Sequence, residues 1–286
     1  MPSTVPASFD AFFNAINLSG DHREVANARR DHIVSMLSKS FTIIDSFSSG
    51  SIPRFTALRA HADLDVMVVL HWTYHIKDKT PSQVLQAVSK ALDFRTGVRK
   101  NGQAVTLGYA TWPNVDIVPV SVTYNADSSV SHYNVPDSNT EAWIQSNPKT
   151  HAITIESKAN ECGPNFRRII KMLKHWNRGH SDYLQSYHIE VLALRIFSGT
   201  LGNIGWDLTE FFNKARGLVA EPLYYGSAFV DNYLSTLDRA EILKRLQTAY
   251  EQSRQAWYQT YGTNSNHRAG IEKWRQLFGD SFPAYG

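Results

Sequence analysis

The stretch over residues 47–70, FSSGSIPRFTALRAHADLDVMVVL, constrains the fold of this 286-residue chain more than any other. It ends in a short Val-rich run, residues 66–70, which holds no Gly or Pro and therefore predicts a buried strand. Side chains alternate along a strand, so Asp63 and Asp65 leave on one face. Leu64 then points the other way, into the core.

The two carboxylates at the mouth of this strand indicate a cation site. Two acids side by side repel each other unless a cation lies between them, and hard oxygen ligands favour Mg²⁺ or Mn²⁺. The competing interpretation is that Asp63 and Asp65 are simply solvated, as two acids at a strand end usually are. Upstream, Gly50 lets the backbone approach a ligand closely, and backbone N–H groups with the Ser51 hydroxyl suit a phosphate.

A third carboxylate stands well downstream, in the strand-like segment Asn-Val-Asp-Ile-Val-Pro-Val over residues 114–120. Its acid is Asp116. A Gly-Ser pair, a polar loop, Asp-x-Asp on a strand and a later third Asp resemble, in this order, the nucleotidyltransferase superfamily with the polymerase-β-like core. The resemblance implies that Asp63, Asp65 and Asp116 are catalytic and bind metal.

Composition narrows the classes of protein. The hydrophobic content is 42% and the charged content 19%, which fits a globular protein. The net charge of +3 is too small to indicate a large nucleic-acid track. The single cysteine, Cys162, excludes an internal disulfide and a Cys-rich zinc site, and it favours a reducing, cytoplasmic location. No apolar run predicts a membrane span.

The hydrophobic period changes near residue 150, which predicts two domains in an α+β protein. Residues 1–150 are expected to form the catalytic core, a mixed β-sheet with helices that includes the N-terminal helix. Residues 151–286 are expected to be a helical domain that completes the nucleotide pocket. Predicted elements of the core are helices over 6–40, with a break near Gly20, and over 81–92, strands over 42–47 and 130–135, and a short helix over 142–146. Residues 105–110 are expected to lead into the strand that carries Asp116.

Residues 165–178 predict a helix with its lysines on one side. Lys171 and Lys174 are three residues apart and so lie close together on the face opposite the apolar residues. A solvated helix face is the ordinary explanation for such a pair. Two cations that face a metal–carboxylate cluster would instead grip a triphosphate. Ser186-Tyr187 follows at the start of the next predicted helix.

These helical motifs narrow the resemblance. Lys-Met-Leu-Lys-His-Trp over residues 171–176 and Ser-Tyr-His-Ile-Glu over 186–190 resemble the oligoadenylate synthases and the cyclic GMP–AMP synthase group. The tail over 269–282, with its Leu-Phe-Gly-Asp, is similar to the bacterial members of that group. These are the CD-NTases, nucleotidyltransferases of the anti-phage CBASS signalling systems.

The resemblance implies a role for each matching residue. Asp63 and Asp65 would bind both of two Mg²⁺ ions, with Mn²⁺ as a substitute, and Asp116 would bind the catalytic ion and accept the proton. The phosphates would be held by the Gly50-Ser51 turn and by three side chains, which are Lys171, Lys174 and Ser186. Tyr187 would stack on a base.

Base choice rests on Asn165. Some bacterial members that prefer uridine carry an asparagine near the start of the lysine-bearing helix, and the Asn165 amide suits a uracil edge. The alternative is that Asn165 is a helix N-cap. The chain lacks an obvious zinc insertion and a strongly basic face, which argues against activation by double-stranded DNA. The terminal Gly286 suits conjugation to a target, but a solvated end is the better explanation.

The predicted function is an Mg²⁺-dependent nucleotidyltransferase that makes a cyclic di- or oligonucleotide second messenger. Its partners would be NTP substrates, purine nucleotides and UTP among them, and a downstream effector that responds to the product. Two alternatives stay open. One is a linear or RNA-tailing enzyme on the same core, and the other is a protein-nucleotidylating enzyme. Neither linkage, ring size nor the activating signal follows from the sequence.

Overall fold

The chain forms two compact units in the structure, which is a computed structural model that describes residues 1–18, 20, 22–92, 98–111, 113–226, 228–261 and 264–286. The sheet unit comprises Gly20–Phe55 and His61–Ile153. The helical unit comprises Met1–Ser19, Thr56–Ala60 and Thr154–Gly286. The N-terminal helix thus packs in the helical unit, whereas the sequence analysis placed it with the catalytic core.

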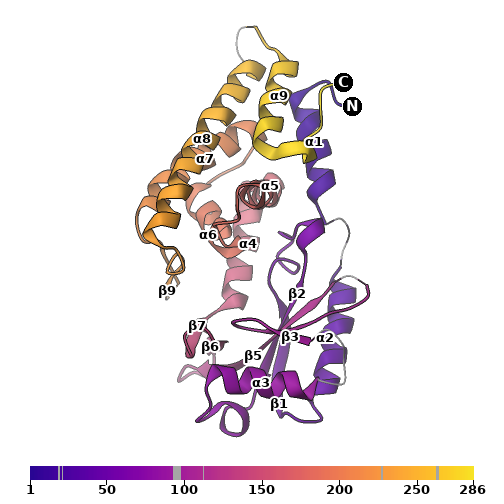
Figure 1. The fold of residues 1–286 in the computed structure, drawn as a ribbon, viewed down its shortest axis with the longest axis vertical. Helices are drawn as coiled ribbons and strands as arrows, with labels where there is room; N and C mark the ends of the chain where they lie inside the picture. Colours follow the sequence, from indigo (N-terminus) through magenta and orange to yellow (C-terminus); the bar gives the residue numbers. More distant parts are fainter. Residues whose placement is uncertain (19, 21, 93–97, 112, 227, 262–263) are drawn as a thin grey trace. The chain divides into compact units, whose positions relative to one another are not determined.

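The sheet unit is built on a mixed sheet in which β5 is central (Figure 1). β2 lies beside β5 in parallel, and β1 pairs with β2 in antiparallel fashion. On its other side β5 pairs first with β4 and then, further along, with β6. The strands are β1 (Ile43–Ser49), β2 (Leu64–Leu70), β3 (Val98–Lys100), β4 (Val105–Leu107), β5 (Val115–Tyr124), β6 (Val130–Asp137) and β7 (Ala142–Ser146).

Two helices, α2 (Arg23–Leu37) and α3 (Pro81–Ala91), pack on this sheet (Figure 1). α3 begins where the sequence predicts, because Thr80 accepts from the backbone of Gln83 and the Gln83 side chain accepts from the backbone of Thr80 in return. Single turns, η1 (Arg59–His61) and η2 (Trp72–Ile76), flank β2. The start of α3 could therefore be predicted from its capping residues.

The short helix expected over residues 142–146 is wrong. These residues form β7, which pairs with β6 so that Val135 faces Ile144 and Pro136 faces Trp143. Five residues are too few to sustain a helix without strong caps, and the ladder of β6 supplies hydrogen bonds that an isolated turn lacks. Pairing with a distant strand therefore decided the conformation.

The helical unit is an all-α bundle with a small hairpin. Its helices are α1 (Val5–Ile16), α4 (Pro148–Cys162), which begins in the sheet unit, α5 (Asn165–Gly179), α6 (Ser186–Ile196), α7 (Ile204–Ala220), α8 (Thr236–Tyr261) and α9 (His267–Phe278). A hairpin of β8 (Tyr224–Tyr225) and β9 (Ala228–Phe229) follows α7, and the turn η3 (Gly279–Ser281) follows α9. Among the described helices, none combines the length and apolar character that a membrane crossing requires.

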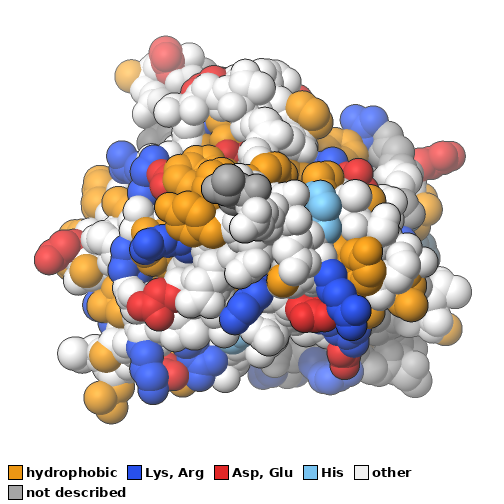
Figure 2. Space-filling view, turned by 90° about the horizontal axis from the view of Figure 1, so that it is seen from above, with side chains coloured by type: hydrophobic (Ala, Val, Ile, Leu, Met, Phe, Trp, Pro, Cys, Tyr) orange, Lys and Arg blue, Asp and Glu red, His pale blue; other side chains and the backbone are white. Residues whose placement is uncertain are grey.

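α5 lies in the middle of this bundle, in contact with α1, α6, α7 and α9. Aromatic rings fill the junction between α1 and the C-terminal helix: the ring of Phe12 lies 4.7 Å from that of Phe278, and Phe9 lies 5.0 Å from Trp274. The N- and C-terminal segments therefore share one core. On the surface that Figure 2 presents, basic and acidic side chains are intermixed, in keeping with the small net charge.

Candidate active site

Two of the three predicted catalytic carboxylates lie side by side on the sheet. Asp65, the second residue of β2, is the direct partner of Asp116, the second residue of β5, in the parallel register of these strands. Neighbouring strands lie about 4.8 Å apart and in-register residues point to the same face, so the two side chains share one face and one end of the sheet. Asp63 stands just before β2 and is exposed.

Gly50 lies against the Asp65 carboxylate. It follows β1, whose last residue, Ser49, pairs with Asp65. Its backbone has φ of 75°, and a Cβ placed there would lie 1.6 Å from Asp65 Oδ2. Only glycine satisfies both the conformation and the close approach. The Gly50-Ser51 turn is thereby held next to the predicted metal ligands.

Thr106 fixes the orientation of Asp116. It stands opposite Asp116 in the antiparallel pairing of β4 with β5, and its Oγ1 donates to Asp116 Oδ1. Sequence reasoning missed Thr106. Thr106 lies in the segment that was expected only to lead into the strand of Asp116; this segment contains β4, and its register with β5 reveals that the two residues are opposite.

The carboxylates fit a divalent cation in kind. Their hard oxygens suit Mg²⁺ or Mn²⁺, and Gly50 leaves open the space beside Asp65 that a side chain would fill. Within the described ranges, however, no group of three or more acidic, His or Cys side chains converges enough to hold a metal ion. Carboxylates without a cation between them repel, and Thr106 holds one oxygen of Asp116. Metal binding by this triad stays a prediction.

Lys171, in the helical unit, is a buried cation with a neutral partner. It lies on α5 and donates to Asn17 Oδ1 at the end of α1. Burial, aided by the charges of Lys174 and Arg167, lowers its pKa from 10.5 to about 8. Only 6% of the residue is exposed. Its ammonium forms no ion pair with a carboxylate in the described part of the chain, so its charge is not neutralised there.

Lys174, one turn later on α5, is in a different situation. Only 3% of its side chain is exposed, and its Nζ lies 2.7 Å from Glu190 Oε1 on α6. Lys171 and Lys174 lie near each other, as expected, but both are buried, so they do not form a solvated face opposite the apolar residues of α5. The assignment of Lys174 as a phosphate contact stays a prediction, which its ion pair with Glu190 does not favour.

Ser186 and Tyr187 begin α6, as predicted, and both are exposed. The Tyr187 ring meets that of Tyr225, on β8, edge to face, with centroids 6.2 Å apart. Behind them, Tyr233 accepts from the Gln185 backbone N–H at the start of the helix and bonds to Nδ1 of the buried His188, each at 2.9 Å. Tyr225 and Tyr233 were missed because they come from the hairpin region, which carries no recognisable motif.

Asn165 is not a helix N-cap. Pro164 occupies the cap position of α5, and Asn165, the first helical residue, donates from Nδ2 to the Leu201 carbonyl at 2.9 Å. The capping alternative is therefore wrong, because the amide is used to tie α5 to the loop before α7. Contact between Asn165 and a base stays a prediction.

Comparison with known proteins gives the family. The model of the Second Messenger Oligonucleotide or Dinucleotide Synthetase domain, abbreviated SMODS, matches residues 3–159, more than half of the chain. The chain belongs to the SMODS family. It is a nucleotidyltransferase, and its resemblance to the bacterial CD-NTases is confirmed.

Named relatives extend over nearly the full length of this SMODS chain. A probable cyclic nucleotide synthase of Bacillus cereus is 22% identical, with 100% of this chain and 99% of that protein covered. A cyclic AMP-AMP-AMP synthase of Acinetobacter is 24% identical, with 90% of this chain and 78% of that protein covered. Both relatives are named as synthases of cyclic nucleotides.

Solved structures show the same fold. CdnC of Escherichia coli with ATP superposes with a TM-score of 0.77 at 18% identity, covering 97% of this chain and 98% of that one. The cyclic AMP-GMP synthase DncV of Vibrio cholerae with a nonhydrolyzable GTP gives 0.64 at 14% identity, covering 84% and 70%. The predicted α+β fold, a polymerase-β-like core followed by helices, is confirmed.

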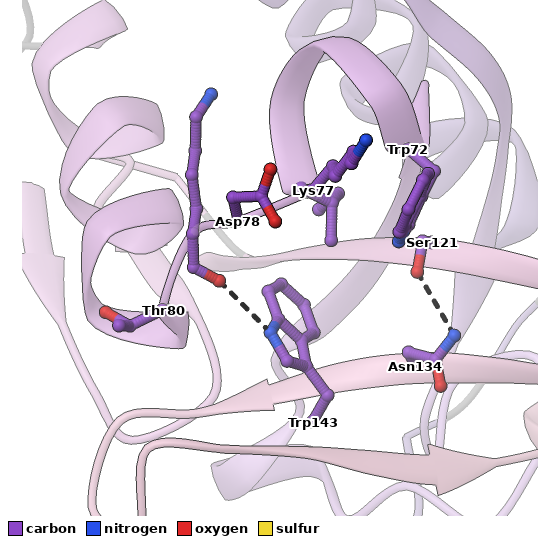
Figure 3. Close-up of a pocket in the computed structure, with 9 residues that line it drawn as sticks. Trp72, Lys77, Asp78, Thr80, Ser121, Asn134 and Trp143 are labelled. Carbon is purple, nitrogen blue, oxygen red and sulfur yellow. Dashed lines mark hydrogen bonds between the residues drawn. The ribbon is translucent and has the colours of Figure 1, made fainter.

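A cavity of about 510 Å³ in the sheet unit of this SMODS enzyme contains none of the predicted site residues. Figure 3 shows the Trp143 indole and the Trp72 side chain within it, with the Trp143 Nε1–H donating to the Lys79 carbonyl at 3.4 Å. On its floor, Asn134 donates to Ser121 Oγ at 3.1 Å. Ser121 lies further along β5 than Asp116, so this cavity is separate from the carboxylates.

Proposed function

We propose that this SMODS enzyme joins nucleoside triphosphates into a cyclic di- or oligonucleotide and releases pyrophosphate. The register that sets Asp65 beside Asp116, with Gly50 against Asp65, is the observation that carries the proposal. It combines a pair of metal-type carboxylates with a turn whose backbone N–H groups suit a phosphate. The family match supports the reaction class.

The residues of the sheet unit account for the transfer step. A ribose hydroxyl oxygen forms a bond to the α-phosphorus of an NTP, the bond from that phosphorus to pyrophosphate breaks, and the hydroxyl proton passes to a carboxylate oxygen of Asp116. Asp63, Asp65 and Asp116 would hold two Mg²⁺ ions, with Mn²⁺ as a substitute. When bound, these ions supply the charge that lowers the pKa of the hydroxyl and neutralises pyrophosphate.

Further residues are proposed as substrate contacts. Gly50 and Ser51 would hold phosphate through the backbone N–H and the hydroxyl, and Lys171 and Ser186 would add a cation and a second hydroxyl. Tyr187 is exposed and offers its ring for stacking on a base. A repeat of the same transfer within a linear product closes the ring.

The relatives indicate which nucleotides to test first. CdnC was solved with ATP, and DncV was solved with GTP analogue and with the linear intermediate pppA(3′,5′)pG. We take ATP and GTP as the first substrates, with UTP included because of Asn165. The product would act on an effector in anti-phage signalling, in the cytoplasm and without activation by double-stranded DNA.

The experiment is a product assay. Purified protein is incubated with Mg²⁺ or Mn²⁺ and four radiolabelled NTPs, and the products are treated with phosphatase and resolved. We expect a small phosphatase-resistant product that disappears in an Asp63→Ala, Asp65→Ala double variant. Omitting each NTP in turn names the bases. The control is Asp31→Ala, which removes an exposed carboxylate paired with Arg30.

Other outcomes select the alternatives. A phosphatase-sensitive ladder alone would replace cyclisation by linear polymerisation. Label transferred to protein would favour a protein-nucleotidylating enzyme. A product that the double variant still makes would remove the carboxylates from the mechanism.

A further inference from the structure

Lys174, Glu190 and Thr56 form a closed triangle of hydrogen bonds inside the helical unit. Lys174 Nζ donates to Glu190 Oε1 at 2.7 Å and to both the carbonyl and the Oγ1 of Thr56 at 3.2 Å. Thr56 Oγ1 in turn donates to Glu190 Oε1 at 2.6 Å. The ammonium has three hydrogens, and these three acceptors match them.

The triangle is dry. Lys174 is 3% exposed, and Glu190 and Thr56 are fully buried. A buried charge is tolerated only when it is paired and hydrogen-bonded, and removal of one partner leaves the other uncompensated. Moving the Lys174 ammonium to a phosphate would strip Glu190 of its cation in the core. Each charge therefore holds the other in place.

Thr56 stands where the chain passes between the units. It is the first residue of the segment Thr56–Ala60, which packs in the helical unit, while the residues on both sides of the segment belong to the sheet unit. The Gly50-Ser51 turn lies just before it and Asp63 just after it. Contacts that fix the position of Thr56–Ala60 therefore also fix the ends of the two flanking loops, one from the Gly50-Ser51 turn and one to Asp63.

The far end of the segment is anchored too. Leu58 forms a β-bridge with Asn17, and Arg59 donates to the carbonyls of Asn17 and Asn14 at the end of α1, at 3.2 and 3.1 Å. Asn17 is also the residue that accepts from Lys171. The segment is thus attached at Thr56 to α5 and α6, and at Leu58 and Arg59 to α1.

We infer that Lys174 is a positioning residue, which with Glu190 and Thr56 fixes the segment between the phosphate-binding turn and the metal-binding aspartates. The inference rests on the proposed function of that turn and those aspartates. Of the two lysines on α5, Lys171 is the one whose charge no carboxylate neutralises among the described residues, and it alone serves as the phosphate contact.

The test uses charge removal, one partner at a time and then together. The variants are Lys174→Met, Glu190→Leu and the double variant, with Lys171→Met as the matched lysine control on the same helix. We expect each single variant of the pair to lose about tenfold or more in kcat/KM, because a lone buried charge distorts the segment. The double variant should return to within about threefold of the parent, because both charges are gone. Lys171→Met should raise the KM for NTP, with or without Glu190→Leu.

Hydrogen exchange of the amides in residues 56–60 is the second readout. It should speed up in each single variant and recover in the double variant. The inference is overturned if the double variant keeps the slow exchange of the parent yet shows the raised KM of Lys174→Met, since Lys174 would then contact phosphate directly. It is also overturned if exchange stays slow in both single variants. Should the parent make no nucleotide product, the exchange pattern still decides the role of the triangle, so the two proposals fail separately.

Discussion

At the scale of single residues, three of the side chains proposed for chemistry contact a residue from another segment of the chain. Thr106 donates to Asp116, Asn17 accepts from Lys171, and Tyr225 lies edge-on to Tyr187. These neighbours would orient the side chains to which the proposal assigns the chemistry. Two predictions belong to this scale, one for a carboxylate and one for a lysine.

Asp116→Asn is expected to abolish product formation while the thermal midpoint stays level or rises slightly. The carboxamide cannot serve as the proton acceptor and is a poor cation ligand, and the change removes the repulsion from Asp65 across the strand pair. The assay is initial rate together with thermal unfolding. An Asp116→Asn enzyme that still forms product would contradict the assigned role. A variant whose thermal midpoint matches that of the parent only when metal is added would contradict it too.

Lys171 should make NTP binding pH-dependent. Its folded pKa is about 8, so the ammonium is charged below that pH and is lost above it. We expect the KM for NTP to rise above about pH 8, by up to about tenfold per pH unit, because only the charged form attracts phosphate. The measurement is the KM against pH. Lys171→Arg keeps its charge and should show a flat profile, whereas equal slopes in the two proteins would exclude Lys171 as the cause.

At the scale of elements, local signals and long-range pairing contributed differently. α3 carries its own start signal in Thr80 and Pro81, and it begins there. β7 carries no decisive local signal and is a strand because β6 lies next to it. Two predictions belong to this scale. One concerns Gly50, in the turn after β1, and the other concerns Asp207, in the first turn of α7.

Gly50→Ala is expected to lower activity strongly and to destabilise the sheet unit by about 1 kcal/mol or more, since φ of 75° is costly for any residue with a Cβ. The added methyl would also displace the Asp65 carboxylate, 1.6 Å away. Denaturant unfolding and initial rates measure the two effects. Gly226→Ala is the control. Gly226 has φ of 65° and open space around it, so this variant introduces the backbone strain but no steric clash.

Asp207→Asn should stabilise the helical unit. Burial raises the pKa of Asp207 from 3.8 to about 6, and the charge of Glu210 adds to this rise. A hydrogen bond with the Asn203 backbone acts in the opposite direction and lowers the pKa. The folded state therefore holds this proton more tightly than the unfolded state, and stability falls as pH rises from about 4 to about 6.

Asp207→Asn removes this pH-dependent loss of stability, because an amide does not ionise. We expect the free energy of unfolding near pH 7.5 to rise by about 1–2 kcal/mol in Asp207→Asn, with no gain near pH 4 where the parent is already protonated. Denaturant unfolding at both pH values is the measurement. A gain of equal size at both would show that burial of the charge is not the cause.

At the scale of the whole molecule, the order of segments in the chain is not the order of the units. The chain starts in the helical unit, enters the sheet unit, returns for Thr56–Ala60 and comes back for good in α4. The N-terminal helix is therefore part of the core that also includes Phe282, close to the C-terminus.

Phe12→Ala tests this arrangement. Phe12 is fully buried against Phe278 and Phe282, and removing its ring should lower the unfolding free energy of the helical unit by about 3–5 kcal/mol. Amide exchange should speed up in α5 and α9 and stay unchanged in β2 and β5. Phe229→Ala, which truncates a half-exposed ring, is the control. It should change neither the unfolding free energy nor the amide exchange of α5 and α9. Faster exchange confined to β2 would place α1 with the sheet.

The sequence by itself determined the chemistry and the fold class. Gly50, the three aspartates and the Lys-bearing helix stand in an order that resembles the nucleotidyltransferases, and this resemblance indicated the reaction class, while the role of each residue stays a prediction. Tertiary structure alone decided the rest: that Asp65 faces Asp116, that β7 is a strand, and that Lys174 is buried against Glu190. The reason is physical. Periodicity and motif spacing report interactions within one segment, whereas register, burial and charge pairing depend on which distant segment lies opposite.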